Sequence, residues 1–227
     1  FTAPSHASVF SSRYPPELMR QDRHPDYTDK PTLPQVLGTY GYHTGAFVAG
    51  GDLDPELQVG VGFDVYESPA DFGSFYHTVP PALAWVDGLT DDKPWFLFVH
   101  SYEAHTPYLK PPPIGSMAID AAYNGPGAIA TRTAVDRIVD DVFVGNPGPL
   151  FQVQRTILRP HSPLGRQEIA RILATQQPPP MKLGPADFDF VRGSYDGAVA
   201  YADAWFGLLL AELDARGELD HTVIVVM

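Results

Sequence analysis

The sequence predicts an α/β fold, in which strands and helices alternate along the chain. Residues 95–99 read Trp-Phe-Leu-Phe-Val. Such a nearly continuous apolar run is typical of a strand covered on both faces, as in a parallel sheet flanked by helices. From Asp187 onward, apolar residues recur at helical spacing. A buried strand and a long amphipathic helix in one chain favour the α/β class.

The first part of the chain is expected to alternate between short helices and short strands. A helix is predicted over residues 34–40 and a strand over residues 43–48, with Gly41 as the break between them. A second short helix is predicted over residues 80–89, before the apolar strand at residues 95–99.

The middle of the chain is expected to be less regular. Residues 107–128 are rich in proline and glycine and predict an irregular excursion. Helices are predicted over residues 131–144 and 165–175, and residues 177–180 (Gln-Pro-Pro-Pro) predict a loop.

The end of the chain carries the clearest helical pattern. Its apolar residues share one face of the predicted helix: Ala198, Tyr201, Ala202, Trp205, Leu208, Leu209 and Leu213. Gly217 is expected to cap this helix, because glycine readily adopts the left-handed conformation found there. The apolar run at residues 222–227 predicts a final strand.

Length and composition are typical of a globular protein with one large domain or two small ones. The chain has 227 residues, of which 44% are hydrophobic and 19% charged, and it shows no internal repeat and no linker. It opens with Phe1 rather than Met, has no signal-peptide pattern and ends inside an apolar run. We therefore expect both ends to be cuts through a larger domain. The sequence assigns no cellular compartment.

Charge and cysteine content exclude several classes of function. The formal net charge of -12 argues against a nucleic-acid partner, which needs a basic face. A local site can still bind an anionic small molecule. The chain has no cysteine, so neither a disulfide nor a thiolate metal site is possible. No apolar run approaches the roughly 18 residues of a membrane helix, and no membrane span is expected.

The segment from Thr2 to Ser8 reads Thr-Ala-Pro-Ser-His-Ala-Ser and suggests a loop that enters a helix. Proline is favoured in a first helical turn. The free N–H groups and the dipole of that turn favour an anion beside Thr2. A hydroxyl placed there can act as a nucleophile if a metal or a base lowers its pKa. A plain N-terminal turn, capped by the hydroxyl of Ser5 or Thr2, is the alternative.

This segment, continued to Arg13, resembles the signature of the sulfatase family: Cys or Ser, any residue, Pro, any residue, Arg, and then a small-residue helix. It is closer still to a sulfatase-like branch with Thr-x-Pro-Ser-His-Ala-Ser. The resemblance continues in chain order with a helix and strand, a Gly-Phe-Asp turn, a strand followed by a His-x-Pro-Tyr-like segment, and a long helix before a strand. These lie at residues 33–48, 62–64, 96–108 and 195–222. The match covers most of residues 1–110 and 190–227.

The resemblance implies an alkaline-phosphatase-like sheet, mostly parallel, flanked by helices and incomplete at both termini. Residues 1–227 would form one partial catalytic domain, with residues 110–190 as an insertion over the pocket. The implied function is metal-dependent cleavage of sulfate esters by a hydroxyl nucleophile. Two alternatives stay open: a phosphodiesterase or phosphonate-ester hydrolase of the same superfamily, and a truncated, non-catalytic relative. The implied substrate is an anionic ester of a small molecule or glycan; the oligomeric state is not implied.

The resemblance also implies roles for individual residues. Thr2 stands at the family's nucleophile, where its hydroxyl would contact the metal and attack the ester; threonine cannot become formylglycine, which moves the expectation towards phosphate esters. His6 stands in place of the signature arginine and would support the nucleophile or bind the anion, and Ser5 would help to bind the substrate. His105 would bind the bridging oxygen or protonate the leaving group. His100 is expected to pack near the end of its strand.

Two family features are not found in the sequence. The family's lysine and histidine after its second strand have no counterpart in residues 48–52 (Val-Ala-Gly-Gly-Asp). The cofactor implied is a divalent cation, usually calcium in this family, whose main acidic ligands would lie outside this chain. The acids inside the chain are expected to be turn or solvent-facing residues: Asp52, Asp54, Asp64, Asp91, Asp92, Asp196 and Asp203.

Overall fold

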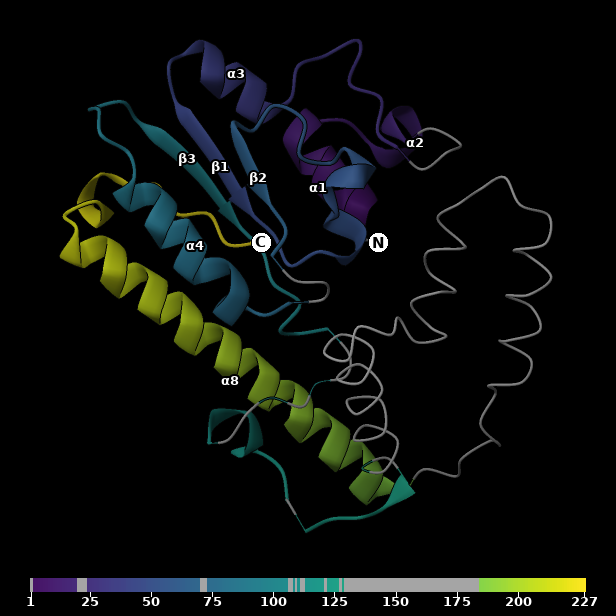
Figure 1. Cartoon of the computed structure of the whole chain (residues 1–227). Coiled ribbons are helices and arrows are strands. Elements are labelled where there is room, and N and C mark those ends of the chain that lie inside the picture. Colours follow the sequence, from purple (N-terminus) through teal and green to yellow (C-terminus); the bar gives the residue numbers. More distant parts are fainter. Residues whose placement is uncertain are drawn as a thin grey trace. The chain divides into compact units, whose positions relative to one another are not determined.

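The computed structural model describes residues 2–19, 24–69, 73–105, 108, 110, 113–120, 122–126, 128 and 184–227. The chain divides into two compact units (Figure 1). Unit 1 comprises Phe1–Glu103 and Ala202–Met227, and unit 2 comprises Ala104–Tyr201. None of the described helices is long and apolar enough to cross a membrane.

Unit 1 is built on a parallel sheet of three strands in the order β2-β1-β3 (Figure 1). The central strand β1 is His43–Phe47, β2 is Val65–Glu67 and β3 is Trp95–Val99. The predicted α/β class and both predicted strands of this region are therefore confirmed. β2 was not predicted, because three residues are too short to show a periodic pattern.

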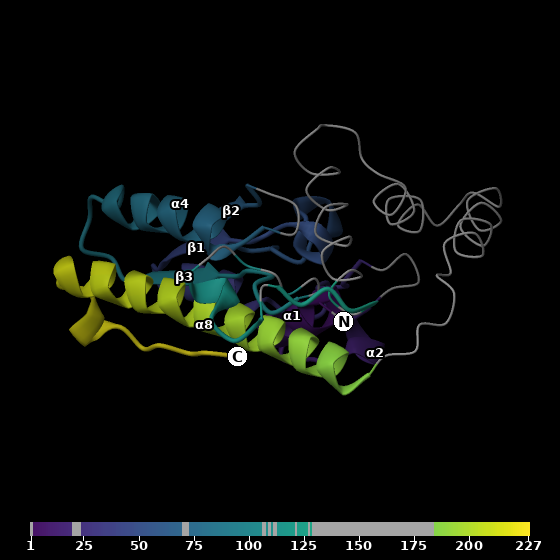
Figure 2. The ribbon, with the colours of Figure 1, turned by 90° about the horizontal axis from the view of Figure 1, so that it is seen from below.

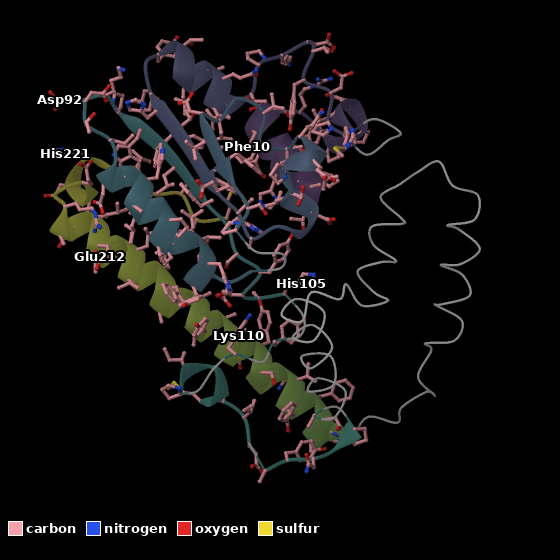
Figure 3. The ribbon with its side chains drawn as sticks, viewed as in Figure 1. Phe10, Asp92, His105, Lys110, Glu212 and His221 are labelled. Atoms are coloured by element: carbon pink, nitrogen blue, oxygen red, sulfur yellow. The ribbon has the colours of Figure 1, made fainter. Side chains whose placement is uncertain are left out.

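Side chains of β3 point alternately to the two helical layers, as the geometry of a strand requires. Trp95 and Val99 pack against a cluster formed by helices α4 and α8. Phe98 points the other way and contacts Phe10 of α1, with ring centroids 5.0 Å apart. Phe10 is labelled in Figure 3, where it points from its helix toward the sheet. The continuous apolar run of β3 thus reflects cover on both faces.

Helix α4 covers the first face and spans Phe75–Asp87, so it begins earlier than the predicted start at residue 80. Ser74 caps it: the Ser74 hydroxyl accepts the Tyr76 N–H at 3.2 Å, and the His77 Nδ1 accepts the Ser74 N–H at 3.2 Å. Two prolines, Pro80 and Pro81, therefore lie inside the helix. The predicted start was wrong because proline is commonest in a first turn, whereas here the cap at Ser74 sets the start.

Helix α8 spans Pro185–Ala215, and its residues from Ala202 onward belong to unit 1. Both views of the ribbon show its last turns alongside α4 (Figure 1, Figure 2). There, Leu209 and Leu213 join Val79 and Leu83 of α4 in one buried cluster.

The predicted apolar face of α8 is confirmed at Leu209 and Leu213, which are both buried. It is wrong at Leu208, which is 44% exposed, because a residue adjacent to Leu209 points about 100° away around the helix. Gly217, at φ 76°, ends the helix: its N–H donates to the Asp214 carbonyl at 2.8 Å. The predicted cap is thus confirmed. The short 3₁₀ turn η4 follows at Leu219–His221.

Residues 222–227 do not form the predicted strand. They pair with no strand in the described part of the chain, and Val223 is 89% exposed. Their apolar, β-branched composition supplies strand propensity, but a strand also needs a neighbour to satisfy its backbone hydrogen bonds.

Helices α1 (Thr2–Ser11), α2 (Pro15–Leu18) and α3 (Leu33–Thr39) belong to the same unit. Both α1 and β1 lie against α3. The start of α3 carries a capping box of Thr32 and Gln35, and the Thr32 hydroxyl donates to the Val61 carbonyl at 2.7 Å. Gly41, at φ 84°, makes the predicted break before β1. Two short 3₁₀ turns, η1 (Gly51–Leu53) and η2 (Pro55–Leu57), follow β1.

Unit 2 contains the first part of α8 and the 3₁₀ turn η3 (Ile114–Ser116). Gly193 and Gly197 of α8 lie so close to this segment that a Cβ would overlap the carbonyl oxygens of Ala118 and Gly115, respectively. The described parts of residues 107–128 show only turns and short helical pieces, as predicted. The helices predicted over 131–144 and 165–175, and the loop at 177–180, lie outside the described residues.

We expect Gly45→Ala to destabilise the protein by about 1–3 kcal/mol, because the new methyl group overpacks the core. A Cβ at Gly45, in the centre of β1, would lie 2.9 Å from the indole of Trp85. The matched control is Gly38→Ala in α3, where a Cβ would meet nothing within 4 Å and helix propensity favours alanine. Urea unfolding of the two variants measures the difference. Equal stability of Gly45→Ala and the natural protein would refute the close packing described here.

Candidate functional site

The candidate site lies where the parallel strands β1 and β3 end. Helix α1 lies against η1, the turn that follows β1. On the same helix, the ring of His6 contacts the ring of His100, the first residue after β3. Ligand sites in open α/β sheets favour this carboxyl edge. The tertiary structure therefore brings the start of α1 to the place where such a site is expected.

Two side chains hold the main-chain carbonyl of Thr2. The Ser5 hydroxyl donates to it at 2.9 Å, and Nδ1 of His6 lies 2.8 Å from it. The hydroxyls of Ser8 and Ser11 make the same kind of bond to carbonyls one turn back, at 2.8 and 2.7 Å. Serine and histidine side chains along α1 thus bond carbonyls of the preceding turn in the helix that carries Thr2.

The bond to Thr2 fixes the tautomer of His6. A carbonyl oxygen only accepts hydrogen bonds, so the neutral imidazole must carry its hydrogen on Nδ1. Nε2 is then the unprotonated nitrogen and can accept a proton. The side-chain hydroxyl of Thr2 bonds to none of the described residues, so it is available for chemistry at the edge of the sheet.

The alternative of a plain capped turn was predicted to use Ser5 or Thr2. A capping hydroxyl accepts a hydrogen bond from a backbone N–H. In the bond to Thr2, Ser5 instead donates, and Thr2 is itself the first residue of α1. The substrate-binding role of Ser5 stays a prediction, as does the role of Thr2 as nucleophile and metal contact.

The rings of His6, Phe98, His100 and Tyr102 form a cluster at this edge. His6 meets Phe98 and His100 edge to face, with centroids 5.7 and 5.0 Å apart. His100 meets Tyr102 edge to face at 4.8 Å. Nδ1 of His100 is buried and has no hydrogen-bond partner among the described residues. His100 therefore packs near its strand end, as predicted, but it does so directly against a candidate catalytic residue.

Burial controls the charge of both histidines. It lowers the pKa of His6, although the hydrogen bond to the Thr2 carbonyl opposes the shift. Burial, reinforced by the nearby His6, lowers the pKa of His100 to about 3. Both rings are therefore neutral at neutral pH.

Tyr102 connects this cluster to the loop after β1. Its hydroxyl donates to the Gly50 carbonyl at 3.3 Å and accepts the Asp52 N–H at 3.2 Å. Gly50 and Gly51 have φ values of 68° and 60°, which favour glycine. This is the loop in which the family's lysine and histidine have no counterpart, and two of its residues are glycines without a side chain.

The acids predicted to be turn or solvent-facing residues behave as predicted where their contacts are resolved. Asp54 caps η2 by accepting the Glu56 N–H at 2.9 Å, and Asp64 accepts the Thr44 N–H at 2.9 Å. Asp91 is exposed, and its carboxylate lies 2.8 Å from Lys93. The other exposed acids of the set are Asp92, Asp196 and Asp203.

His105, predicted to assist the leaving group, lies in unit 2 (Figure 3). It is exposed and occupies a bend shortly after β3. The contacts of unit 1 thus bring together Thr2, Ser5, His6 and His100, while the role of His105 stays a prediction.

A divalent cation needs several oxygen ligands from the protein. Calcium prefers six to eight oxygen ligands, mostly carboxylates. In the part of the chain that the structure describes, no group of three or more His, Cys, Asp or Glu residues could hold a metal ion. The described residues therefore do not form a calcium site by themselves, and the Thr2 hydroxyl stays a predicted metal contact.

Sequence reasoning missed the connection made by Phe98, His100 and Tyr102. The signal was present as aromatic side chains at every second position, which places them on one side of an extended chain. Which helix they would meet there was not contained in that pattern.

Comparisons with known proteins give one family. The sequence model described as Sulfatase matches residues 1–227. A comparison with curated protein sequences gives no match.

Several solved structures share the fold. One is BT4656 in complex with its substrate D-glucosamine-2-N,6-O-disulfate, at TM-score 0.53 and 16% identity over 97% of this chain and 54% of that chain. A second is the phosphonate monoester hydrolase of Agrobacterium radiobacter, with a TM-score of 0.53 and 16% identity over 96% of this chain and 51% of that chain. A third is the C-terminal periplasmic domain of EcEptC from Escherichia coli in complex with Zn, with a TM-score of 0.52 and 12% identity over 95% of this chain and 46% of that chain.

These likenesses confirm the alkaline-phosphatase-like α/β fold. The chain spans about half the length of the solved structures it matches.

The histidine cluster predicts a pH dependence of stability. The pKa of His100 is about 3 in the folded protein, whereas the usual histidine value is 6.5. Below pH 6.5 the unfolded chain therefore binds a proton that the folded chain excludes. Stability from this group is therefore present above the unfolded pKa and falls as the pH is lowered towards the folded pKa.

We expect the natural protein to lose about 1 kcal/mol more free energy of unfolding than His100→Phe between pH 7 and pH 5.5. Urea unfolding at the two pH values measures it, and subtraction removes the contribution of the carboxylates, which both proteins share. His6 and Tyr102, the groups that face His100, are also unchanged in the comparison. Parallel pH curves for the two proteins would show that His100 titrates normally.

Proposed function

Because the chain belongs to the sulfatase family, we propose that it carries the nucleophile of a hydrolase that cleaves a sulfuric or phosphoric ester through the Thr2 hydroxyl. The observation that supports this most is the set of hydrogen bonds around Thr2. Ser5 and His6 both bond its carbonyl, at 2.9 and 2.8 Å, at the carboxyl edge of the sheet. Its hydroxyl is at the same time free of bonds to described residues.

The proposed first step forms a bond from the Thr2 oxygen to sulfur or phosphorus and breaks the bond to the ester oxygen. The hydroxyl proton passes to a base, and Nε2 of His6 is the available acceptor in the tautomer that the Thr2 carbonyl imposes. His6 would therefore act as a base rather than as the donor that replaces an arginine. The departing alkoxide takes a proton from His105, and water then cleaves the covalent threonine ester.

The chemistry of threonine favours a phosphate ester over a sulfate ester. A phosphothreonine can be hydrolysed by attack of water at phosphorus, whereas a sulfothreonine lacks the elimination route that formylglycine provides. The loop after β1 supports this preference, because the loop carries no lysine that could bind a sulfate. Its main chain is held by Tyr102 at Gly50 and Asp52. A small-molecule or glycan ester remains the proposed substrate class, and sulfate-ester hydrolysis is the second candidate.

A divalent cation, calcium by family usage, is part of the proposal. Thr2 would give it one oxygen, and the remaining ligands would come from outside the described residues. When bound, such an ion supplies charge that stabilises an alkoxide and the transferred group.

Replacing the nucleophile provides the direct test. We expect Thr2→Val, which keeps the shape of the side chain without the hydroxyl, to lower hydrolysis of an aryl phosphodiester by about a thousand-fold or more. Thr2→Ser, the matched control, should keep most of the activity because it keeps the hydroxyl. Assays of kcat/KM on an aryl phosphodiester and an aryl sulfate, in the longest available form of the protein, measure both. Undiminished turnover by Thr2→Val would remove Thr2 from the nucleophile role.

The limited set of metal donors leads to a separate expectation. We expect the 227-residue chain alone to show neither metal-dependent hydrolysis nor micromolar calcium binding, because its described residues offer no group of three acidic or histidine ligands. Titration calorimetry with calcium chloride measures the binding. A micromolar affinity that Thr2→Val abolishes would reveal a complete metal site within the chain.

A further inference from the structure

The residue that connects the parts of the candidate site is His100. It follows the last residue of β3, and its backbone N–H donates to the Phe47 carbonyl at 3.0 Å, which continues the pairing with β1. This bond fixes the side of the sheet to which its ring projects. Phe98, two residues earlier, projects to the same side, since the two rings are nearly parallel at 14°.

His100 lies between two rings with different tasks. One is His6, which meets it at 88° with centroids 5.0 Å apart. The other is Tyr102, at 88° and 4.8 Å. Edge-to-face pairs at these distances are close to the short end of the favourable range, so movement of the His100 ring displaces both neighbours.

Each neighbour in turn holds a different part of the site. His6 bonds the carbonyl of Thr2, and Tyr102 bonds the loop after β1 at Gly50 and Asp52. The contacts therefore run without a break from the first residue of α1 to the loop after the central strand, and the ring of His100 is their midpoint.

The ring, rather than its nitrogen atoms, makes these contacts. Nδ1 is buried and has no hydrogen-bond partner among the described residues. A buried polar atom without a partner lowers stability, so fold stability gives no reason for an imidazole here. A ring of similar shape without nitrogen should keep the contacts to His6 and Tyr102.

We propose that His100 is a positioning residue: its ring holds His6 in the orientation in which Nδ1–H is donated to the Thr2 carbonyl and Nε2 is free to accept a proton. The Nδ1–H tautomer is favoured only while Nδ1 faces that carbonyl. If the ring of His6 can turn about its Cβ–Cγ bond, either nitrogen can carry the hydrogen. Phe98 and His100 are the two rings that restrict this motion. This inference rests on the proposed function for its catalytic consequence, but its structural part can be measured without turnover.

The test is the tautomer of His6, read from the ¹⁵N chemical shifts of its imidazole in the ¹⁵N-labelled chain, with the resonances assigned by their loss in His6→Gln. We expect one tautomer, Nδ1–H, in the natural protein. His100→Ala should give a mixture of tautomers, because the ring that restricts His6 is gone. His100→Phe should restore the single Nδ1–H form, because it restores the ring.

A matched control separates positioning from general loosening. Phe63 belongs to the same aromatic layer, where it contacts Phe10, Tyr66 and Phe96, but no ring contact joins it to His6 in the described structure. Phe63→Ala should therefore destabilise the fold while His6 keeps its Nδ1–H form. An unchanged tautomer in His100→Ala, a mixture in His100→Phe, or the same mixture in Phe63→Ala would each overturn the proposal.

Kinetics distinguish this inference from the proposed function. With an aryl phosphodiester as the probe, we expect His100→Ala to lower kcat by about 10- to 100-fold with little change in KM, since misplacement of a catalytic group affects the chemical step. His100→Phe should recover most of the loss. If the tautomer responds as expected but no form of the protein turns over either ester, the proposed function fails and the positioning of His6 stands. If turnover is normal in His100→Ala, the positioning role fails and the function stands.

Discussion

The parallel pairing of β1 with β3 is the constraint on which the candidate site depends. Five residue pairs join the two strands, from His43 with Trp95 to Phe47 with Val99. Because both strands run the same way and end together, the loop at Gly50 and the segment at His100 emerge at one edge. A slip of one residue would turn Phe98 and His100 to the opposite face of the sheet. Contact with His6 would then be lost, so the register of two short strands governs the site.

The two faces of this sheet pack against different kinds of side chain. On one face, α4 and the end of α8 bury an aliphatic cluster around Val79 and Leu83. Arg216 joins the same elements by two hydrogen bonds to the Asp87 carboxylate, at 2.7 and 2.9 Å. On the other face, aromatic and imidazole rings meet α1. Apolar packing thus covers both faces, and the imidazole rings lie on the second.

Polar atoms in the interior of unit 1 are used to join elements. The buried carboxylate of Glu103 accepts the Phe75 N–H at 2.9 Å, which ties the segment after β3 to the start of α4. An acid suits that place because a helix N-terminus carries free N–H groups and positive potential. Tyr102, its neighbour, ties the same segment to the loop after β1. The end of β3 is therefore fixed from both sides, which is what a site built on it requires.

The order of the motifs in the sequence was enough to identify the family, and the apolar run at residues 95–99 was enough to predict a buried parallel strand, because local pattern alone determines both. Residues whose surroundings are local also followed the prediction, as Gly217 and Asp54 show. Residues 222–227 did not, since strand formation depends on a partner that no local pattern contains.

For the site, the sequence by itself singled out His105 and three residues within one helical turn of each other, Thr2, Ser5 and His6. It undervalued His100, ninety-four positions beyond His6, because only strand register and helix packing bring those two rings to 5.0 Å. The sequence therefore determined the chemical groups of the turn that begins at Thr2. The tertiary structure alone decided which ring holds them in place, because contacts between distant segments depend on the sheet on which both are mounted.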